Sequence, residues 1–256
     1  MAQLNNFYNN SNIKLLEQDA SKMFQVIEHQ ADLSLSPAEA MQAYFCTEMN
    51  VKRRQVLVNL NGNNSAILSQ GSMQWMLGNI DVKTNIQGAG DLLGKMVAGK
   101  VTGESAIKPL YFGSGTISLE PTYKHILLED IANWNGGIVM DDGLFLACDG
   151  QLQQKVYRKS FSGGLSEKGN FFNMSLIGSQ GTVVLESPVA RAEIIEVMLN
   201  NETLTVDGDL VIAWSPSIQM VCRPMMRRSL IGSGATGEGF VNVFTGTGRV
   251  LLAPTL

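Results

Sequence analysis

Few residues in the 256-residue chain are of the types that carry acid–base, nucleophilic or metal chemistry. The two histidines, His29 and His125, stand in no recognisable nucleophile context such as a GxSxG turn. His125 lies in a run expected to form a β-strand, where a structural or surface role is favoured over metal binding. No histidine, cysteine and carboxylate spacing typical of a zinc site is present. The sequence therefore predicts no catalytic residue, no cofactor-binding residue, no metal ligand and no enzyme.

Neighbouring carboxylates are the next candidates, because paired acids serve glycoside hydrolysis and calcium binding. Aspartate beside glycine is also a common turn sequence, since aspartate accepts backbone N–H groups and glycine adopts positive φ. The turn interpretation is favoured for the three pairs, which are Glu129 with Asp130, Asp141 with Asp142, and Asp207 with Asp209.

Two glycine-rich segments resemble phosphate-binding loops. Residues 232–237 match GxGxxG, but the run after them is typical of a strand, whereas the dinucleotide site needs a helix there. Residues 88–95 have the wrong spacing, and Met96 stands where a phosphate loop needs Ser or Thr. Neither segment predicts a nucleotide site, and residues 91–98 are expected to form a short helix.

Trp75 and Trp214 occupy equivalent predicted strands, with Cys148 near the corresponding place between them. Such residues could stack on a ligand, but filling the core is the favoured interpretation, as it is for Trp134 and for most of the thirteen methionines.

Charge and cysteine content limit the partners and the compartment. The net charge of −4 argues against nucleic acid as a partner, because that binding depends on clustered Lys and Arg. The cluster of Arg223, Arg227 and Arg228 is interpreted as solvated surface. Three widely spaced cysteines, no secretory signal and no apolar run of membrane-spanning length predict a cytoplasmic protein without a membrane span.

The elements around these residues repeat along the chain. Three stretches, beginning at residues 100, 170 and 238, each combine an apolar strand, a glycine-rich turn and a second strand followed by proline. Their last turn glycines, Gly115, Gly181 and Gly248, are 66 and 67 residues apart. The spacing predicts an all-β fold of three tandem units, about 49–116, 117–182 and 183–256. Closure around a pseudo-threefold axis is expected, because it removes exposed sheet edges.

Residues 1–48 precede the first unit as an N-terminal extension with one helix over about 37–48. Ser36 and Glu39 have the spacing of a capping box. Ala40, Met41, Tyr44 and Phe45 then define one apolar face, which is expected to pack on the β body or, less favoured, to contact a partner. Either of two strands could complete the first unit, Leu33 to Pro37 or Val250 to Pro254, and the sequence leaves this open.

The runs GSGTISL, GSQGTVVLESP, DGDLVIAWSPSI and GEGFVNVFTGTGRVLLAP resemble the Altered Inheritance of Mitochondria 24 (mitochondrial biogenesis) family over roughly residues 50–256. The resemblance implies units like the short double-stranded β-helix or β-sandwich of the tryptophan RNA-binding attenuator protein. The N-terminus is unlike a transit peptide, which implies a bacterial member. No catalytic residue is carried over from the family.

The function expected from these observations is that of a non-enzymatic scaffold or protein-interaction protein. Its protein partner is not identified by the sequence, and a homo-oligomer is compatible with the attenuator-like fold. The alternative is a small-ligand or RNA-binding module, by analogy with the attenuator protein.

Overall fold

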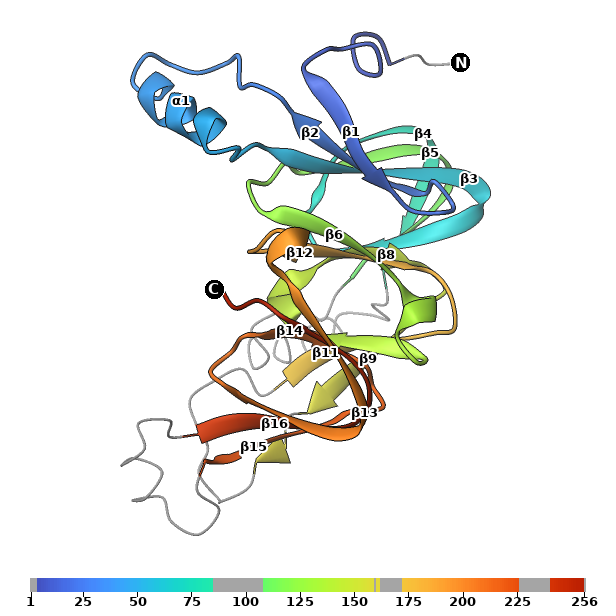
Figure 1. The fold of residues 1–256 in the computed structure, drawn as a ribbon. Helices are drawn as coiled ribbons and strands as arrows, with labels where there is room; N and C mark the ends of the chain where they lie inside the picture. Colours follow the sequence, from blue (N-terminus) through green and yellow to red (C-terminus); the bar gives the residue numbers. More distant parts are fainter. Residues whose placement is uncertain (1–3, 85–107, 159, 162–171, 226–239, 256) are drawn as a thin grey trace, which may run out of the picture.

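The computed structural model describes residues 4–84, 108–158, 160–161, 172–225 and 240–255. Within these ranges the chain is mostly β-structure, and its α-helix is α1 (Ala40–Glu48). Figure 1 shows an elongated molecule in which curled sheets follow one another and α1 projects from the N-terminal end. No helix in the described ranges has both the length and the apolar character needed to cross a membrane.

The first sheet contains eight strands in the order β1-β2-β3-β8-β12-β6, with β5 also beside β3 and β4 beside β5. Apolar side chains alternate or run continuously along its inner strands, so that Phe24 and Leu57 are fully buried. The strands are β1 (Ile13–Gln18), β2 (Phe24–His29), β3 (Arg54–Leu68), β4 (Met73–Lys83), β5 (Leu110–Leu119), β6 (His125–Asp130), β8 (Phe145–Asp149) and β12 (Thr182–Ser187).

The second sheet has the order β10-β15-β16-β14-β7-β11-β9, with β13 also beside β16. Its strands are β7 (Gly137–Met140), β9 (Gln153–Arg158), β10 (Ser160–Phe161), β11 (Phe172–Ile177), β13 (Ile195–Asp207), β14 (Val211–Trp214), β15 (Gln219–Pro224) and β16 (Phe240–Leu252). Three short 3₁₀ helices connect strands: η1 (Ile131–Asn133), η2 (Asp142–Leu144) and η3 (Arg191–Glu193).

The central strands are paired along both edges in three groups, two of them built on one long strand and the middle one on two shorter strands. β5 pairs with β3 along one edge and with β4 along the other. β16 pairs with β13 on one edge and with β14 and β15 on the other. Between them, β12 pairs with β6 and β8, while β11 pairs with β7 and β9. The groups are linked by the β3–β8 and β7–β14 pairings.

The predicted glycine-rich turns are bends inside long strands at two of the three places. β5 runs without a break through Gly113 and Gly115, and β16 through Gly246 and Gly248. Gly113 has a φ of +118°, and a Cβ there would lie 2.3 Å from the Asn79 carbonyl oxygen. The expected hairpin turns are therefore wrong at these two places, because glycine lets a continuous strand curl closely against its neighbour. In the middle group, residues 178–181 do separate β11 from β12.

The N-terminal residues add two strands to the first sheet as well as a helix. β1 pairs with β2, and β2 pairs with β3 from Phe24 opposite Val58 to Glu28 opposite Arg54. Neither Leu33 to Pro37 nor Val250 to Pro254 occupies this edge: the former segment forms no strand, and Val250 belongs to β16. β2 is closer along the chain to β3 than the C-terminal strand is, so its pairing closes a shorter loop.

Several sequence predictions fall on residues outside the described ranges. These are the expected helix over residues 91–98, the glycine-rich segments at 88–95 and 232–237, and Arg227 and Arg228 of the basic cluster.

Buried apolar side chains form three clusters. The one nearest the N-terminus contains Phe24 and Ile117, the middle one contains Trp134 and Ile138, and the third contains Trp214 and Phe244. The expected positions of Trp134 and Trp214 in the core are confirmed, because both side chains are buried. Trp75, in contrast, is only half-buried and lies at the edge of the first sheet.

Candidate functional site: a cleft beneath helix α1

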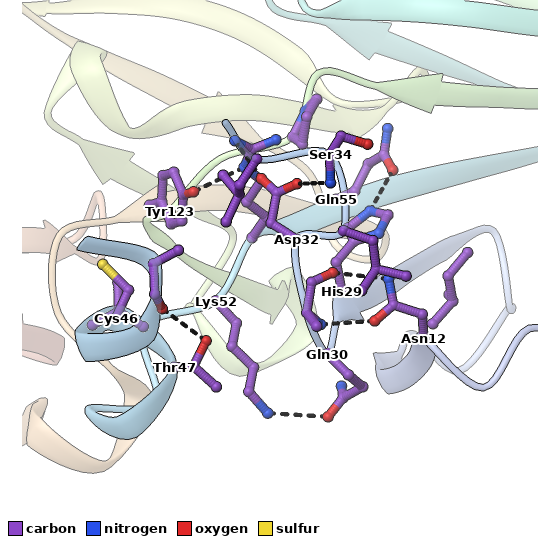
Figure 2. Close-up of a pocket in the computed structure, with 18 of the residues that line it drawn as sticks. Asn12, His29, Gln30, Asp32, Ser34, Cys46, Thr47, Lys52, Gln55 and Tyr123 are labelled. Carbon is purple, nitrogen blue, oxygen red and sulfur yellow. Dashed lines mark hydrogen bonds and ion pairs between the residues drawn. The ribbon is translucent and has the colours of Figure 1, made fainter. Parts of the chain in front are cut away.

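A cavity of about 850 Å³ lies between α1 and the adjacent end of the first sheet. Four segments far apart in the sequence line it: residues 7–13, the 29–55 stretch that includes α1, Gln74 with Trp75, and Pro121 with Tyr123. Figure 2 shows Cys46 and Thr47 on the helix, with His29 and Asn12 on the other side. We refer to this cavity as the α1 cleft.

Amide side chains hold one wall of the α1 cleft. Gln55 is 5% exposed, and its Nε2 donates to Gln74 Oε1 and to the Leu119 carbonyl oxygen, both at 2.7 Å. His29 Nε2 lies 3.2 Å from Gln55 Oε1. Because a carboxamide oxygen can only accept, His29 Nε2 is the donor in this contact. Asn12 fixes the neighbouring loop through reciprocal bonds with the Ala31 backbone.

The cations that line the α1 cleft are paired. Lys52 Nζ donates to Gln30 Oε1 at 3.0 Å and lies 3.7 Å from Glu28 Oε1. Arg53 lies 2.8 Å from Asp32 Oδ2, and its Nε donates to the Tyr123 hydroxyl at 2.9 Å. The bond to Tyr123 raises the pKa of Arg53. These pairings leave no cluster of one charge sign to attract a polyanion.

Helix α1 forms the opposite wall without burying any of its own residues. Ala43, Tyr44 and Thr47 line the α1 cleft, whereas Met41 and Phe45 remain 72% and 59% exposed. The expected packing of one apolar face on the β body is therefore wrong. Met41, Tyr44 and Phe45 are instead all more than half exposed, and the cleft lies between α1 and the sheet.

The predicted helix start is formed in part. Ser36 donates both its backbone N–H, at 3.0 Å, and its hydroxyl, at 2.6 Å, to Glu39 Oε2. These bonds lower the pKa of Glu39. The regular helix begins at Ala40, inside the predicted range, because residues 37–39 form a turn first.

His29, Asp32 and Cys46 all line the α1 cleft. Asp32 is paired with Arg53, and His29 contacts Gln55. In the described ranges, no group of three or more His, Cys, Asp or Glu residues could hold a metal ion. What the cleft does offer is amide donors and acceptors beside aromatic rings, such as Trp75 in edge contact with Phe7 at 6.0 Å. This combination suits binding of peptide or other uncharged polar groups.

The other residues considered in the sequence lie elsewhere. His125 is half-buried on β6, and burial lowers its pKa. Cys148 is fully buried, and desolvation raises the pKa of its thiol, which stays protonated. Asp130 accepts the Ala132 N–H at 2.9 Å, and Asp141 accepts the Gly143 N–H at 3.0 Å, as turn residues do.

Glu129 is an exception to the turn interpretation. It is 2% exposed in β6 and accepts hydrogen bonds from Trp134 Nε1 at 3.1 Å and Arg249 Nη1 at 3.2 Å. Arg191 forms a third contact with it. The turn prediction for Glu129 is wrong, because cations from η3 and β16 reach the same buried position and compensate its charge.

The sequence analysis did not predict that Gln55, Gln74 and Tyr123 line the α1 cleft. A single glutamine or tyrosine carries no motif. Gln55 and Gln74 belong to β3 and β4, which both pair with β5, and Tyr123 follows Thr122, which pairs with Arg54.

Comparisons of sequence and structure show which known proteins the chain is similar to. A sequence model of the family described as Mitochondrial biogenesis AIM24 matches residues 47–255. An uncharacterized protein of Streptococcus pyogenes serotype M6 is 29% identical over 216 residues, which cover 81% of this chain and 84% of that protein. A crystal structure of a Streptococcus pyogenes protein aligns with a TM-score of 0.56 at 29% identity, over 79% of this chain and 88% of that one. Most of α1 precedes the matched family range.

Proposed function

The chain belongs to the mitochondrial biogenesis AIM24 family, is rich in β-structure and has one helix, α1, near the N-terminal end of its described residues. We propose that it is a non-enzymatic protein-interaction protein. Its partner-binding surface is the α1 cleft. The occupant is an extended, aromatic-rich segment of another protein, which lies between α1 and the first sheet.

The observation that carries this proposal is the exposure of α1. A helix with an apolar face normally buries that face against the body of the protein. A nine-residue helix is also too short to be stable in water without tertiary contacts. Yet Met41, Tyr44 and Phe45 are each more than half exposed, and no residue of α1 is buried. A partner segment that covers Tyr44 and the cleft would provide the missing contacts.

The lining of the cleft favours a peptide over a polyanion. Peptide groups carry one donor and one acceptor each, which side-chain amides such as Asn12, Gln30 and Gln74 can match. Trp75 and Tyr123 supply aromatic surface for apolar side chains of the partner. The volume of about 850 Å³ lies within the range of ligand pockets in proteins.

The proposal is tested by selecting a displayed random-peptide library on the full chain and measuring the selected peptides by titration calorimetry. Tyr44→Ala should weaken binding by roughly tenfold or more, because aromatic anchors dominate such interfaces. Tyr8→Ala is the matched control, since Tyr8 is 68% exposed and does not line the cleft. Peptides that bind Tyr44→Ala as tightly as wild type would overturn the proposal. Occupation by a second copy would appear as peptide affinity that falls with rising protein concentration, which also contradicts it.

The three-unit architecture belongs to the same proposal. It is supported by the pairing pattern shared by β5, by β12 with β11, and by β16, and by the similar β3–β8 and β7–β14 links between groups. The first and last units then each have one curled central strand flanked on both edges, whereas β12 and β11 together take this place in the middle unit. The described pairings join the first group to the middle and the middle to the last, so closure around a threefold axis stays a prediction, as do the attenuator-like fold and the cytoplasmic location.

A further inference from the structure

β4 and β13 each have one edge without a partner strand. Among the strands of the described chain, β4 pairs only with β5, and β13 pairs only with β16. Figure 1 shows the two strands apart, with β4 beside the N-terminal strands and β13 in the half of the molecule that holds β15 and β16. The backbone N–H and C=O groups along a free edge can pair with a further strand.

The two links between the strand groups have the same register. In the first link, Leu68 of β3 lies opposite Ala147 of β8. In the second link, Met140 of β7 lies opposite Ala213 of β14. Both links are antiparallel and continue with one further pair each, Ile67 with Cys148 and Val139 with Trp214. A strand of one group is therefore joined to the next group in the same way at both places.

β4 has the same relation to its central strand as β8 and β14 have to theirs. The residues that correspond are Met76 opposite Ile117, Cys148 opposite Val183, and Trp214 opposite Val250. Along the sequence, the three central-strand residues are separated by 66 and then 67 positions, the spacing of the turn glycines. A register shift also occurs beside each of these pairs. β4 thus presents the edge that β8 and β14 use in their links.

A seven-residue spacing identifies the matching place on β13. The two linking residues each stand seven positions before a residue of the following strand in their own group, Leu68 before Trp75 and Met140 before Ala147. In the last group, the residue seven positions before Ala213 is Val206, on β13. By this spacing, Val206 corresponds to the residues that form the two links.

The side chains at these positions are buried where a link exists and more open on β4. Cys148 and Trp214 are 0% and 2% exposed, whereas Met76 is 45% exposed. Ala147 is also fully buried, whereas Trp75 is only half-buried. Apolar residues at the free edge of β4 therefore lack the cover that a paired strand gives at the other two places.

We propose that the free edge of β13 pairs with the free edge of β4 in a second copy of the chain, antiparallel and with Val206 opposite Trp75. The other pairs expected from this register are Thr205 with Met76 and Leu204 with Leu77. Because the contact joins two different surfaces, the copies associate head to tail, as a closed ring or as a filament. The inference rests on the three-unit architecture proposed above and not on peptide binding in the α1 cleft.

Disulfide cross-linking between two variants tests the register. Thr205→Cys and Met76→Cys are made in separate full-length chains that also carry Cys46→Ser, because the other native cysteines are buried. Opposite residues of antiparallel strands have Cα atoms about 4.5–5.5 Å apart, which a disulfide can span. On oxidation, the mixed variants should form a covalent dimer that contains one chain of each kind.

The matched control replaces Met76→Cys by Val82→Cys, which is on the same strand, 44% exposed, and outside the expected pairs. It should cross-link to Thr205→Cys roughly tenfold less. Equal cross-linking of the control would overturn the proposal. So would a disulfide that forms only within one chain carrying both Thr205→Cys and Met76→Cys, because the two edges would then meet inside a single copy.

Sedimentation velocity over a range of concentrations measures the association itself. The average mass of the wild-type chain should rise above that of one copy as the concentration increases. Met76→Lys should weaken the association roughly tenfold or more, because a lysine at a strand edge opposes pairing. Val82→Lys should associate as the wild type does. A wild-type chain that stays a single copy at every concentration would overturn the proposal, and so would equal association of Met76→Lys.

Peptide titration of Met76→Lys separates this proposal from the one for the α1 cleft. Met76 does not line the cleft, so the variant should bind the selected peptides as the wild type does. Peptide binding by a wild-type chain that never associates would overturn the edge pairing and leave the cleft proposal standing. Association that Met76→Lys weakens, in a chain that binds no peptide, would support the edge pairing and count against the cleft.

Discussion

The α1 region and the surroundings of Trp134 use similar residue types with opposite results. On α1, Phe45 and Met41 are mostly exposed, and the nearest β wall is separated from the helix by a cavity. Around Trp134, strands of both sheets converge, and even the carboxylate of Glu129 is buried. Apolar composition therefore does not by itself determine burial; the number of elements that converge on a position does.

The charged groups of the two regions also differ in how exposed they are to water. In the α1 cleft, Arg53 pairs with Asp32 where water reaches both groups, so the pair adds little stability. Glu129 is 2% exposed, and its side chain depends on Arg249 and Trp134. Loss of one partner there leaves a buried charge uncompensated. The middle of the molecule should therefore be sensitive to substitution and the α1 region tolerant.

The largest expected effect is at Glu129. Glu129→Ala leaves Arg249, whose side chain is 13% exposed, without its inner partner and should lower the free energy of unfolding by about 3–5 kcal/mol. Glu196→Ala is the control, because Glu196 contacts the same arginine at 2.6 Å but is 46% exposed; its cost should stay below about 1 kcal/mol. Urea unfolding measures both. Equal losses of unfolding free energy in the two variants would show that the burial of Glu129 does not make it more important for stability than Glu196.

The next effect concerns the strand bends. Gly113→Ala should cost about 3 kcal/mol, because its φ is +118° and the new Cβ would lie 2.3 Å from the Asn79 carbonyl oxygen. Gly62→Ala has a φ of +89° but no atom within 4 Å, so only the backbone cost of about 1 kcal/mol applies. Thermal unfolding of the two variants separates the cost of the close contact from the cost of the positive φ. Similar losses of stability in both variants would contradict the crowding at Gly113.

A small effect is expected on α1. Phe45→Ser should change the free energy of unfolding by less than about 0.5 kcal/mol, because the ring is 59% exposed. Phe244→Ser, at a fully enclosed site of the third apolar cluster, should cost about 3–5 kcal/mol under the same conditions. A loss above about 2 kcal/mol at Phe45 would mean that α1 packs on the body after all.

The smallest effect is the pH dependence of the α1 start. The bonds from Ser36 lower the pKa of Glu39 in the folded chain, so the contribution of Glu39 to stability is present above its ordinary pKa. This contribution is lost as the pH falls through the lowered pKa of Glu39. The backbone amide signals of Ala40 and Ala43 should therefore shift between about pH 5 and about pH 2. In Ser36→Ala the midpoint should move upward, and an unchanged midpoint would exclude this contact as the cause.

Local sequence features predicted much of the chain. The β5 and β16 strands, the special glycines at Gly113 and Gly248, and a helix that includes Tyr44 all follow from residue type and spacing. The glycines were expected in turns, however, and two of the three sites are bends. Positive φ is a property of one residue, whereas a turn or a bend depends on which strands lie on either side.

By itself, the sequence determined the β-rich fold, the additional helix and the small number of groups able to do chemistry, because propensity, alternation and residue type are local properties. Only the tertiary structure decided that α1 stays exposed over a cleft, that Glu129 is buried, and that Trp214 Nε1 and Asn173 Oδ1 are buried without a hydrogen-bond partner among the described residues. Those outcomes depend on which distant strands meet. Pairings such as β7 with β14 and β3 with β8 join residues that are more than 70 positions apart in the chain.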